Sequence, residues 1–392
     1  MTKIIKNFLV LLVIGAFSCG NETTESSHEE NGFVPNPQEM DEQPVGKLQI
    51  GDDAPPFRLP DVSGRFYSLT DFDDSEVLVI NFTCNHCPTA QAYEDRYIAL
   101  VEEYENQSVQ FIGISPNSPI AVLPEELGYS DLNDDFESMK LRYKDKGYNF
   151  PYLYDGDDHE FSLAYGPTAT PHVFVFDKER KLTYAGRIDA NEKPGTGNSE
   201  DLRSAIDNTL IGESVTQGIT PAFGCSTKWA WKNEFNKKVE KEWQEKPVSV
   251  DKVSIEQLQD IMRNDSEELL LVNFWATWCG PCVIEYPEFI EMQRMYGERD
   301  FRFISVSMDD PSQEEKVLKF LKNKYSAVPN YLIDTDDKYA VIDLVDQEWD
   351  GSLPITLLIE PQGNVAYKRL GTIDVYELRK TIVDHPMIGR YY

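Results

Sequence analysis

The fold is decided by the stretch Trp-Cys-Gly-Pro-Cys at residues 278–282, which places two thiols three positions apart. Residues 269–275 before it are almost all apolar, which is typical of a buried parallel strand, and residues 283–296 show helical spacing. Cys279 therefore lies at the start of a helix, where the helix dipole favours a thiolate over a thiol. We expect Cys279 to be the attacking thiol and Cys282, one turn into the helix, to resolve the mixed disulfide.

Half of a zinc site and a structural disulfide are the other interpretations of this cysteine pair. A zinc ribbon needs a second close pair of cysteines further along the chain, and no cysteine follows Cys282. We therefore prefer a redox-active pair, with a structural role as the alternative.

Composition limits the size and the partners of the protein. With 392 residues, 41% of them hydrophobic, more than one domain with its own core is expected. The chain has 37 basic and 68 acidic residues, a net charge of −31, which argues against binding to nucleic acid or to an anionic membrane surface. We expect no cofactor and no resident metal.

The start of the chain has the pattern of an export signal. A cationic segment precedes the apolar run Phe8–Phe17, which is too short to cross a bilayer but suits a signal peptide. Residues 16–20, Ala-Phe-Ser-Cys-Gly, resemble a bacterial lipobox, in which Cys19 is lipidated and becomes the mature N-terminus; plain secretion is the alternative. We expect a lipoprotein signal peptide over 1–19 and a disordered acidic tether over 20–46.

This start predicts an extracytoplasmic protein held at a membrane by its lipid, in the periplasm or cell envelope. Disulfides persist in such compartments, whereas cytosolic thiols stay reduced. An odd number of thiols remains once Cys19 is set aside, so one lacks an intramolecular partner or is available for exchange. The five are Cys84, Cys87, Cys225, Cys279 and Cys282.

The order of predicted elements occurs twice along the chain. Residues 78–82 and 111–115 match residues 270–274 and 303–307 in residue type and order. In each half, strand-helix-strand units are followed by an antiparallel pair of strands, which predicts a mixed sheet flanked by helices. The fold class is therefore α/β, with two tandem domains of one fold. The expected domains are residues 47–232 and 248–392, joined by a connecting helix over 233–247.

The repeat also predicts the nucleophile of the first domain. Cys279 lies five residues after its strand ends at Phe274. Five residues after the matching strand end, at Phe82, comes Cys87, which we therefore expect to be the nucleophile. An alanine takes the place of the second thiol, so the resolving thiol must come from elsewhere. The two candidates are Cys84, in the loop before the helix, and the distant Cys225.

The second half resembles the extracytoplasmic thiol–disulfide oxidoreductases of the ResA and TlpA type, which have the thioredoxin fold. The resemblance rests on the 278–282 stretch, on Glu285 and Pro287 after it, and on Leu353-Pro354, which is similar to the family's cis-proline facing the dithiol. It implies reduction of disulfide-containing partner proteins, with electrons from a membrane donor of the DsbD/CcdA type. We also expect Cys279 to pass electrons to the first-domain cysteines.

Glu285 is the expected proton acceptor for Cys282. Asn273 stands where thioredoxin has a buried aspartate, and an asparagine side chain cannot take up a proton. The resemblance implies that Glu285 replaces it, and burial would raise the pKa of its carboxyl into the useful range. A solvated helix glutamate is the alternative.

The first half resembles the peroxiredoxin-like (AhpC/TSA, redoxin) branch of the same fold. The residues that carry the resemblance are Thr-Cys-Asn-His-Cys-Pro at 83–88 and Gly-Cys-Ser-Thr-Lys-Trp at 224–229. Thr170-Pro171 is the candidate for its cis-proline. His86, between the two thiols, either stabilises a thiolate or is an exposed loop histidine.

Two other functions of the first half stay open. A thiol peroxidase using Cys87 would normally have a threonine three positions earlier, and Cys84 stands there instead. A copper-binding or delivery module would use Cys84 and Cys87 with His86 and a distant His159 or His172.

Overall fold

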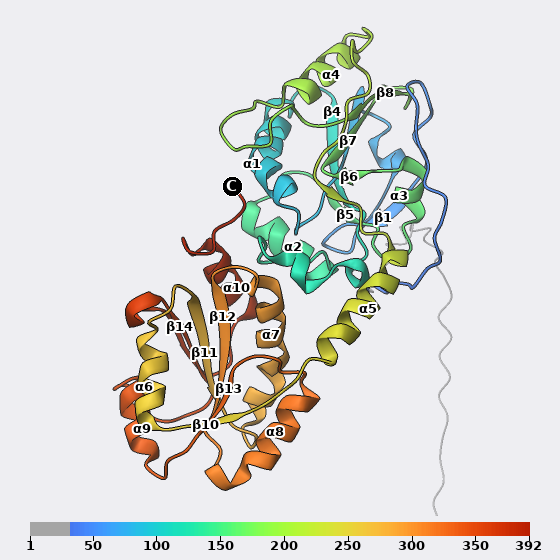
Figure 1. Cartoon of the computed structure of the whole chain (residues 1–392). Helices are drawn as coiled ribbons and strands as arrows, with labels where there is room; N and C mark the ends of the chain where they lie inside the picture. Colours follow the sequence, from blue (N-terminus) through green and yellow to red (C-terminus); the bar gives the residue numbers. More distant parts are fainter. Residues whose placement is uncertain (1–31) are drawn as a thin grey trace, which may run out of the picture. The chain divides into compact units, whose positions relative to one another are not determined.

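The computed structural model describes residues 32–392, so the predicted signal peptide and Cys19 lie outside the described residues. No helix within the described range is long and apolar enough to cross a membrane. Two separate mixed sheets organise this part of the chain, one with five strands and one with six. Helices cover both faces of each sheet, so the predicted fold class is confirmed (Figure 1).

The five-stranded sheet, which defines the first domain, has the order β5-β4-β3-β7-β8. Its central strand β3 (Val77–Phe82) is parallel to β4 (Val109–Ser115) and antiparallel to β7 (His172–Phe176). The outer strands are β5 (Tyr152–Tyr154) and β8 (Leu182–Gly186). The helices are α1 (Pro88–Glu103), α2 (Phe136–Lys146), α3 (Glu160–Tyr165) and α4 (Glu200–Leu210).

Two short strand pairs accompany this sheet. The hairpin of β1 (Arg58–Pro60) and β2 (Phe66–Ser68) adds apolar side chains to the face that α3 covers. The second pair joins β6 (Ala169–Thr170) to β9 (Cys225–Ser226), segments far apart in the sequence.

The six-stranded sheet, which defines the second domain, has the order β10-β13-β12-β11-β14-β15. Its strands are β10 (Asp251–Val253), β11 (Leu269–Trp275), β12 (Phe301–Ser307), β13 (Asn330–Ile333), β14 (Ile355–Ile359) and β15 (Val365–Leu370). The helices are α6 (Ile255–Arg263), α7 (Gly280–Tyr296), α8 (Glu314–Asn323), α9 (Lys338–Val345) and α10 (Val375–Asp384). Helix α5 (Asn233–Gln244) precedes this sheet.

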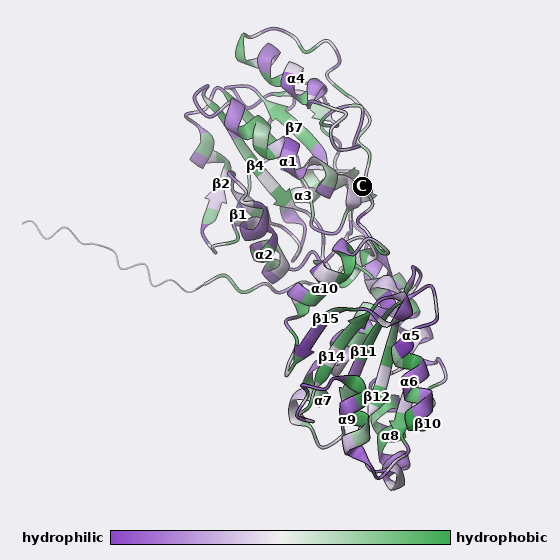
Figure 2. Cartoon of the chain, turned by 90° about the vertical axis from the view of Figure 1, so that its left-hand side faces the viewer, coloured by the Kyte–Doolittle hydropathy of each residue, from purple (hydrophilic) through white to green (hydrophobic). Residues whose placement is uncertain are grey.

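The central strands are buried on both faces because helices lie on either side. Along β11, Leu269 and Leu271 pack with α7, α8 and α10, while Leu270 and Val272 pack with α6 and α9. This alternation explains why the whole strand is apolar rather than apolar at every second residue. In Figure 2, β11 and β12 are hydrophobic, whereas the outer strand β15 is hydrophilic.

The first domain contacts the second at the C-terminal end of α7. The short 3-10 helix Pro124–Leu127 packs against α7, and Leu127 belongs to the apolar core of the second domain. Tyr296, the last residue of α7, donates a hydrogen bond to the carbonyl of Ser130 (2.8 Å). Arg294 is ion-paired with Glu125 (2.8 Å). These contacts hold the two domains together at the end of α7 opposite to Cys279.

Candidate functional site

The second-domain site forms where β11 passes into α7. Cys279 caps the helix and forms a disulfide with Cys282. Both sulfurs are shielded, Cys279 at 5% exposure and Cys282 at 1%, so the expected nucleophile is the more accessible of the two. The Leu353-Pro354 peptide bond is cis, as the sequence predicts.

Apolar side chains around this disulfide are turned to solvent. Trp278, immediately before the first cysteine, is 66% exposed, and Ile284, two positions after the second, is 79% exposed. Exposed large apolar side chains beside a reactive group are typical of a surface that another protein covers.

Glu285 has the environment that the expected proton acceptor needs. Its side chain is 4% exposed, and burial raises the pKa of the carboxyl to about 7, although the Ile373 N–H that it accepts (3.0 Å) acts to lower it. Its other carboxylate oxygen has no hydrogen-bond partner. Asn273 lies buried and donates to the hydroxyl of Thr356 (3.0 Å). Glu285 is therefore a buried titratable group rather than a solvated helix residue.

Three thiols converge in the first domain. Cys87 caps α1, and in its thiol form it donates to the carbonyl of Thr170 (3.1 Å). Cys84 is hydrogen-bonded through its sulfur to the Thr170 hydroxyl (3.1 Å). Cys84 and Cys87 are buried with Ala90, and the half-buried Cys225 packs against them. The three cysteines that the sequence proposed for this domain thus form one cluster.

Cys225 reaches the cluster through the β6–β9 pair. Thr170 in β6 is the register partner of Cys225 in β9, and the Thr170-Pro171 bond that follows is cis. The Cys225 N–H donates to the sulfur of Cys87 (3.2 Å). A two-residue ladder therefore places a thiol from the end of the first domain next to the helix cap.

His86 is a buried member of an ion pair and not an exposed loop histidine. It is 2% exposed, and its Nδ1 lies 2.5 Å from Oδ2 of Asp134. Burial acts to lower the pKa of the imidazole, but the charge of Asp134 and the hydrogen bond to it act more strongly, so that the pKa of His86 is raised. The pKa of Asp134 is lowered by the same contact, against the effect of burial. The contact with Asp134 therefore favours the protonated form of a buried imidazole next to the thiols.

The three thiols differ in how readily they ionise. Burial acts to raise the pKa of Cys87, but hydrogen bonds from Cys225 and Cys84 and the charge of His86 bring it well below the ordinary value. Burial raises the pKa of Cys84, and the hydrogen bond to Cys87 raises that of Cys225. Of the three thiols, Cys87, the residue at the position of the second domain's nucleophile, is thus the one whose ionisation its surroundings favour.

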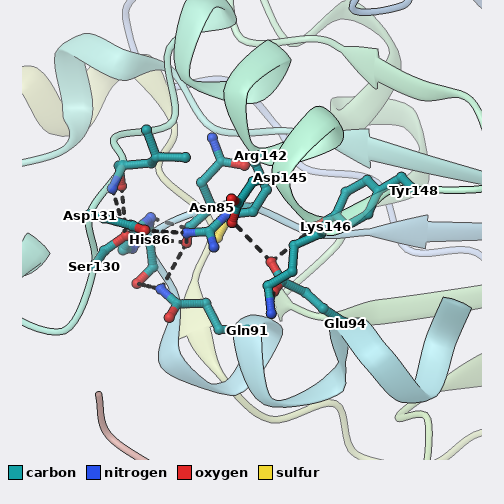
Figure 3. A network of polar contacts seen from close by, with 12 residues as sticks. Asn85, His86, Gln91, Glu94, Ser130, Asp131, Arg142, Asp145, Lys146 and Tyr148 are labelled. Carbon is teal, nitrogen blue, oxygen red and sulfur yellow. Dashed lines mark hydrogen bonds and ion pairs between the residues drawn. The ribbon is translucent and has the colours of Figure 1, made fainter. Parts of the chain in front are cut away.

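A polar network fixes the loop that carries these cysteines (Figure 3). Arg142 is buried and pairs with Asp131 (2.7 Å), while it also donates to the carbonyl of Asn85. Gln91 donates to the same carbonyl (2.9 Å) from the first turn of α1. The main chain between the two thiols is therefore held from two sides.

Among residues 32–392, one group of side chains could hold a metal ion, and it differs from the predicted set. Cys84, His86 and Asp134 offer ligand atoms that lie within 4.8 Å of one another. His159 was one predicted ligand, but its Nδ1 contacts the carbonyl of Pro116 (2.9 Å) and its Nε2 accepts from the Ala230 N–H (2.8 Å). Both ring nitrogens of His159 are therefore occupied, and this part of the copper hypothesis is wrong. The other candidate histidine, His172, lies outside the group and accepts a hydrogen bond from Thr168.

The two cysteine sites lie far apart. Tyr296, which contacts Ser130 near the first-domain cysteine loop, ends the 17-residue helix α7 that begins next to Cys279. At 1.5 Å per residue the helix is about 25 Å long. This separation argues against the expected transfer of electrons from Cys279 to the thiols of the same chain, unless the domains part.

Curated proteins that resemble the chain are thioredoxin-like. It is 26% identical over 113 residues to the thioredoxin-like protein YneN of Bacillus subtilis, which covers 29% of this chain and 62% of that protein. It is 30% identical over 104 residues to the thiol-disulfide oxidoreductase ResA of Bacillus subtilis, which covers 26% of this chain and 54% of that protein. The chain thus spans less than two thirds of the length of either relative.

Among solved structures, a hypothetical protein of Sinorhizobium meliloti is 32% identical, with a TM-score of 0.42; the match covers 47% of this chain and 97% of that one. The fold, the cysteine sites and the relatives define a tandem thioredoxin-fold protein, a thiol–disulfide oxidoreductase. The AhpC/TSA family model matches twice, over residues 50–185 and 233–368, which is more than half of the chain. The chain belongs to the AhpC/TSA family.

Replacing Asp134 tests whether the ion pair lowers the pKa of Cys87. In Asp134→Asn the charge that stabilises the imidazolium is lost, so we expect the pKa of Cys87 to rise by about one unit or more. The measurement is the rate of Cys87 alkylation against pH in the reduced protein. Asp135→Asn is the matched control, because Asp135 caps α2 and asparagine caps equally well. An unchanged alkylation profile in Asp134→Asn would contradict this account.

Glu285→Gln tests the raised pKa of the buried carboxyl. Folding favours the protonated form of Glu285, so native stability should fall as pH rises from the ordinary value of 4.5 to about 7. Glutamine does not ionise, and the variant should be the more stable protein at pH 8 by on the order of 2 kcal/mol, with little difference at pH 4.

Urea unfolding of the oxidised protein at the two pH values measures this difference. Glu291→Gln, on the same helix, is the control. A Glu285→Gln protein whose advantage is the same at pH 4 and pH 8 would show that Glu285 does not titrate in this range.

Proposed function

We propose that the second domain reduces disulfides in partner proteins through Cys279 and Cys282. The observation that carries this proposal is the disulfide at the start of α7, together with the exposed Trp278 and Ile284 that flank its cysteines in the sequence and the cis-proline before β14. In the reduced protein, the Cys279 thiolate attacks the partner disulfide, a mixed disulfide forms, and one partner thiolate leaves. Cys282 then gives its proton to Glu285 and attacks Cys279, which releases the second partner thiol.

Reduction is the proposed direction because the second half of the sequence resembles a family of reductants; the name of the relative ResA, a thiol-disulfide oxidoreductase, fits either direction. We further propose an extracytoplasmic location with a lipid at Cys19 and a membrane electron donor of the DsbD/CcdA type. The cationic and apolar start of the sequence supports the location. The exposed apolar surface around the disulfide suits contact with such a donor and with a disulfide-bonded substrate in turn.

For the first domain we propose a second redox site, with Cys87 as its nucleophile. The lowered pKa of Cys87, next to the buried His86–Asp134 pair and two further thiols, supports it. This site and the second-domain site face different molecules, because the length of α7 separates them.

Cysteine variants separate the two sites. We expect the Cys279→Ser variant to lose nearly all of its catalysis of insulin reduction, because no other thiol in the second domain can begin the attack. The assay supplies electrons as dithiothreitol. Cys282→Ser should instead accumulate mixed disulfides with partners, since its resolving thiol is gone. Cys87→Ser is the control, and it should keep the parental insulin rate. Insulin reduction that depends on Cys87 and not on Cys279 would overturn the assignment.

Metal binding by the first domain is the second candidate, because Cys84, His86 and Asp134 converge. Each would act as a single ligand, and the soft sulfur suits Cu(I). If the site serves metal delivery, the reduced protein should bind one copper per chain, measured by competition with a Cu(I) chelator. Asn117→Ala, which removes the hydrogen bonds of this side chain with Asp134 and with the Lys228 N–H but no ligand atom, should leave that stoichiometry unchanged, whereas Cys84→Ser should abolish it.

A further inference from the structure

The strand β9 runs along the part of the first domain that lies beside its cis-proline. Thr170, the residue before Pro171, pairs with Cys225 of β9 in an antiparallel ladder. The Cys225 N–H points at the sulfur of Cys87 (3.2 Å). An extended cysteine-containing segment is thus already seated between the cis-proline and the nucleophile.

The second domain shows the same edge without such a segment. Leu353 precedes the cis-proline Pro354, yet it pairs with no strand in the part of the chain that the structure describes. Trp278, which precedes Cys279 in the sequence, is turned to solvent. The two edges, which belong to domains of one fold, therefore differ in the presence of β9.

The close fit of β9 depends on a glycine. Gly224 has φ of +139°, and a Cβ built on it would lie 2.0 Å from the carbonyl oxygen of Thr170. On the other side of the strand, the Thr227 hydroxyl donates to the carbonyl of Pro167 (2.8 Å). The next residue, Lys228, donates its N–H to the side chain of Asn117 (2.8 Å). The segment is therefore held in place at both ends and is part of the site.

We propose that β9 is a built-in partner segment: it keeps the cysteine segments of other proteins away from Cys87 and supplies Cys225 as the thiol that pairs with it. The proposal rests on the proposed role of Cys87 as nucleophile. Under this proposal, protein disulfides are the substrates of the second domain and small oxidants are the substrates of the first.

Cys225 suits this role better than Cys84 does. Cys84 is 2% exposed and lies next to Asn85, which Asp134 and Arg142 hold in place, so a disulfide between Cys84 and Cys87 would have both of its sulfurs buried. Cys225 is half-buried in a strand of two residues. A disulfide that includes Cys225 therefore keeps one sulfur within reach of an external dithiol, which must return the electrons.

The oxidant is a hydroperoxide, because only a molecule of a few atoms can reach the fully buried Cys87 beneath β9. The Cys87 thiolate attacks the terminal oxygen, an S–O bond forms, the O–O bond breaks, and the leaving alkoxide takes up a proton. Cys225 then loses its proton and attacks the sulfenic sulfur, which forms the S–S bond and releases water. The sulfurs lose two electrons in total, and an external dithiol restores them as it becomes a disulfide.

The first test maps the disulfide in the full chain, with Cys279 and Cys282 replaced by serine so that only the first domain reacts. After reduction and treatment with one equivalent of hydrogen peroxide, mass spectrometry of peptides should find Cys87 bound to Cys225. A bond between Cys87 and Cys84 would overturn the pairing. The same treatment of a protein that also carries Cys225→Ser, with a reagent that traps sulfenic acid, tests Cys87 alone. If Cys87 stays reduced in both proteins, its proposed role as nucleophile fails.

The second test measures exclusion of foreign segments. The probe is an extended peptide whose single cysteine carries a thionitrobenzoate leaving group, and the readout is the rate of its mixed disulfide with Cys87. Gly224→Ala displaces β9 from Thr170 and should raise this rate at least about tenfold. Gly212→Ala is the matched control, because Gly212 also has positive φ but no atom lies within 4 Å of the added Cβ.

Thr227→Val provides a second route if Gly224→Ala does not fold. It keeps the side-chain volume but loses the hydrogen bond to Pro167, so that β9 detaches more often and the adduct rate rises several-fold. Circular dichroism and thermal unfolding identify the folded variants. Folded Gly224→Ala and Thr227→Val proteins that react at the parental rate would show that β9 does not guard the site.

Discussion

The buried carboxylate of Asp134 is the interaction on which the first-domain site depends. It accepts hydrogen bonds from the main-chain N–H groups of Asn85 and His86 (2.8 and 3.0 Å), from the His86 ring and from Asn117. A buried carboxylate that lacked these donors would destabilise the fold. Three of the donors belong to Asn85 and His86, in the loop between the two thiols. The loop geometry and the raised pKa of His86 therefore both depend on this group, and the charge that His86 can carry acts in turn to lower the pKa of Cys87.

The two domains use one fold to hold a second thiol in different ways. In the second domain it comes from the next turn of α7, as Cys282, and a buried glutamate beside it can exchange a proton at neutral pH. In the first domain Ala90 fills that position, and β9 brings the thiol from outside the helix. When both cysteines lie at the start of the helix, as in the second domain, no strand covers the edge at the cis-proline. When the second thiol lies on a strand, as Cys225 does, that strand occupies the edge. The position of the second thiol thus determines whether a partner's segment has access to the nucleophile.

The sequence predicted the features that depend on local pattern. Apolar strands buried on both faces, the helix starts at Cys87 and Cys279, and both cis-prolines were all visible in short segments. Asp134 was not, because it lies 48 residues from its partner His86 and is one of 68 acidic residues with no pattern to single it out. Strand β9 was missed since two residues carry no periodicity, and its partner strand is equally short. The hydrogen bonds that occupy both ring nitrogens of His159, and so exclude it as a ligand, also depend on tertiary contacts alone.

The interface between the domains determines how electrons can move. Arg390, near the end of α10, pairs with the buried Asp131 (2.8 Å), whose pKa is lowered to about 2 because the charges of Arg142 and Arg390 act more strongly than burial. Buried charges of this kind are costly to separate, so the domains are held where these pairs and the Tyr296 contact place them. Cys279 is then fixed at the far end of α7 from Cys87. Direct passage of electrons from Cys279 to the first-domain thiols would therefore require the two domains to separate.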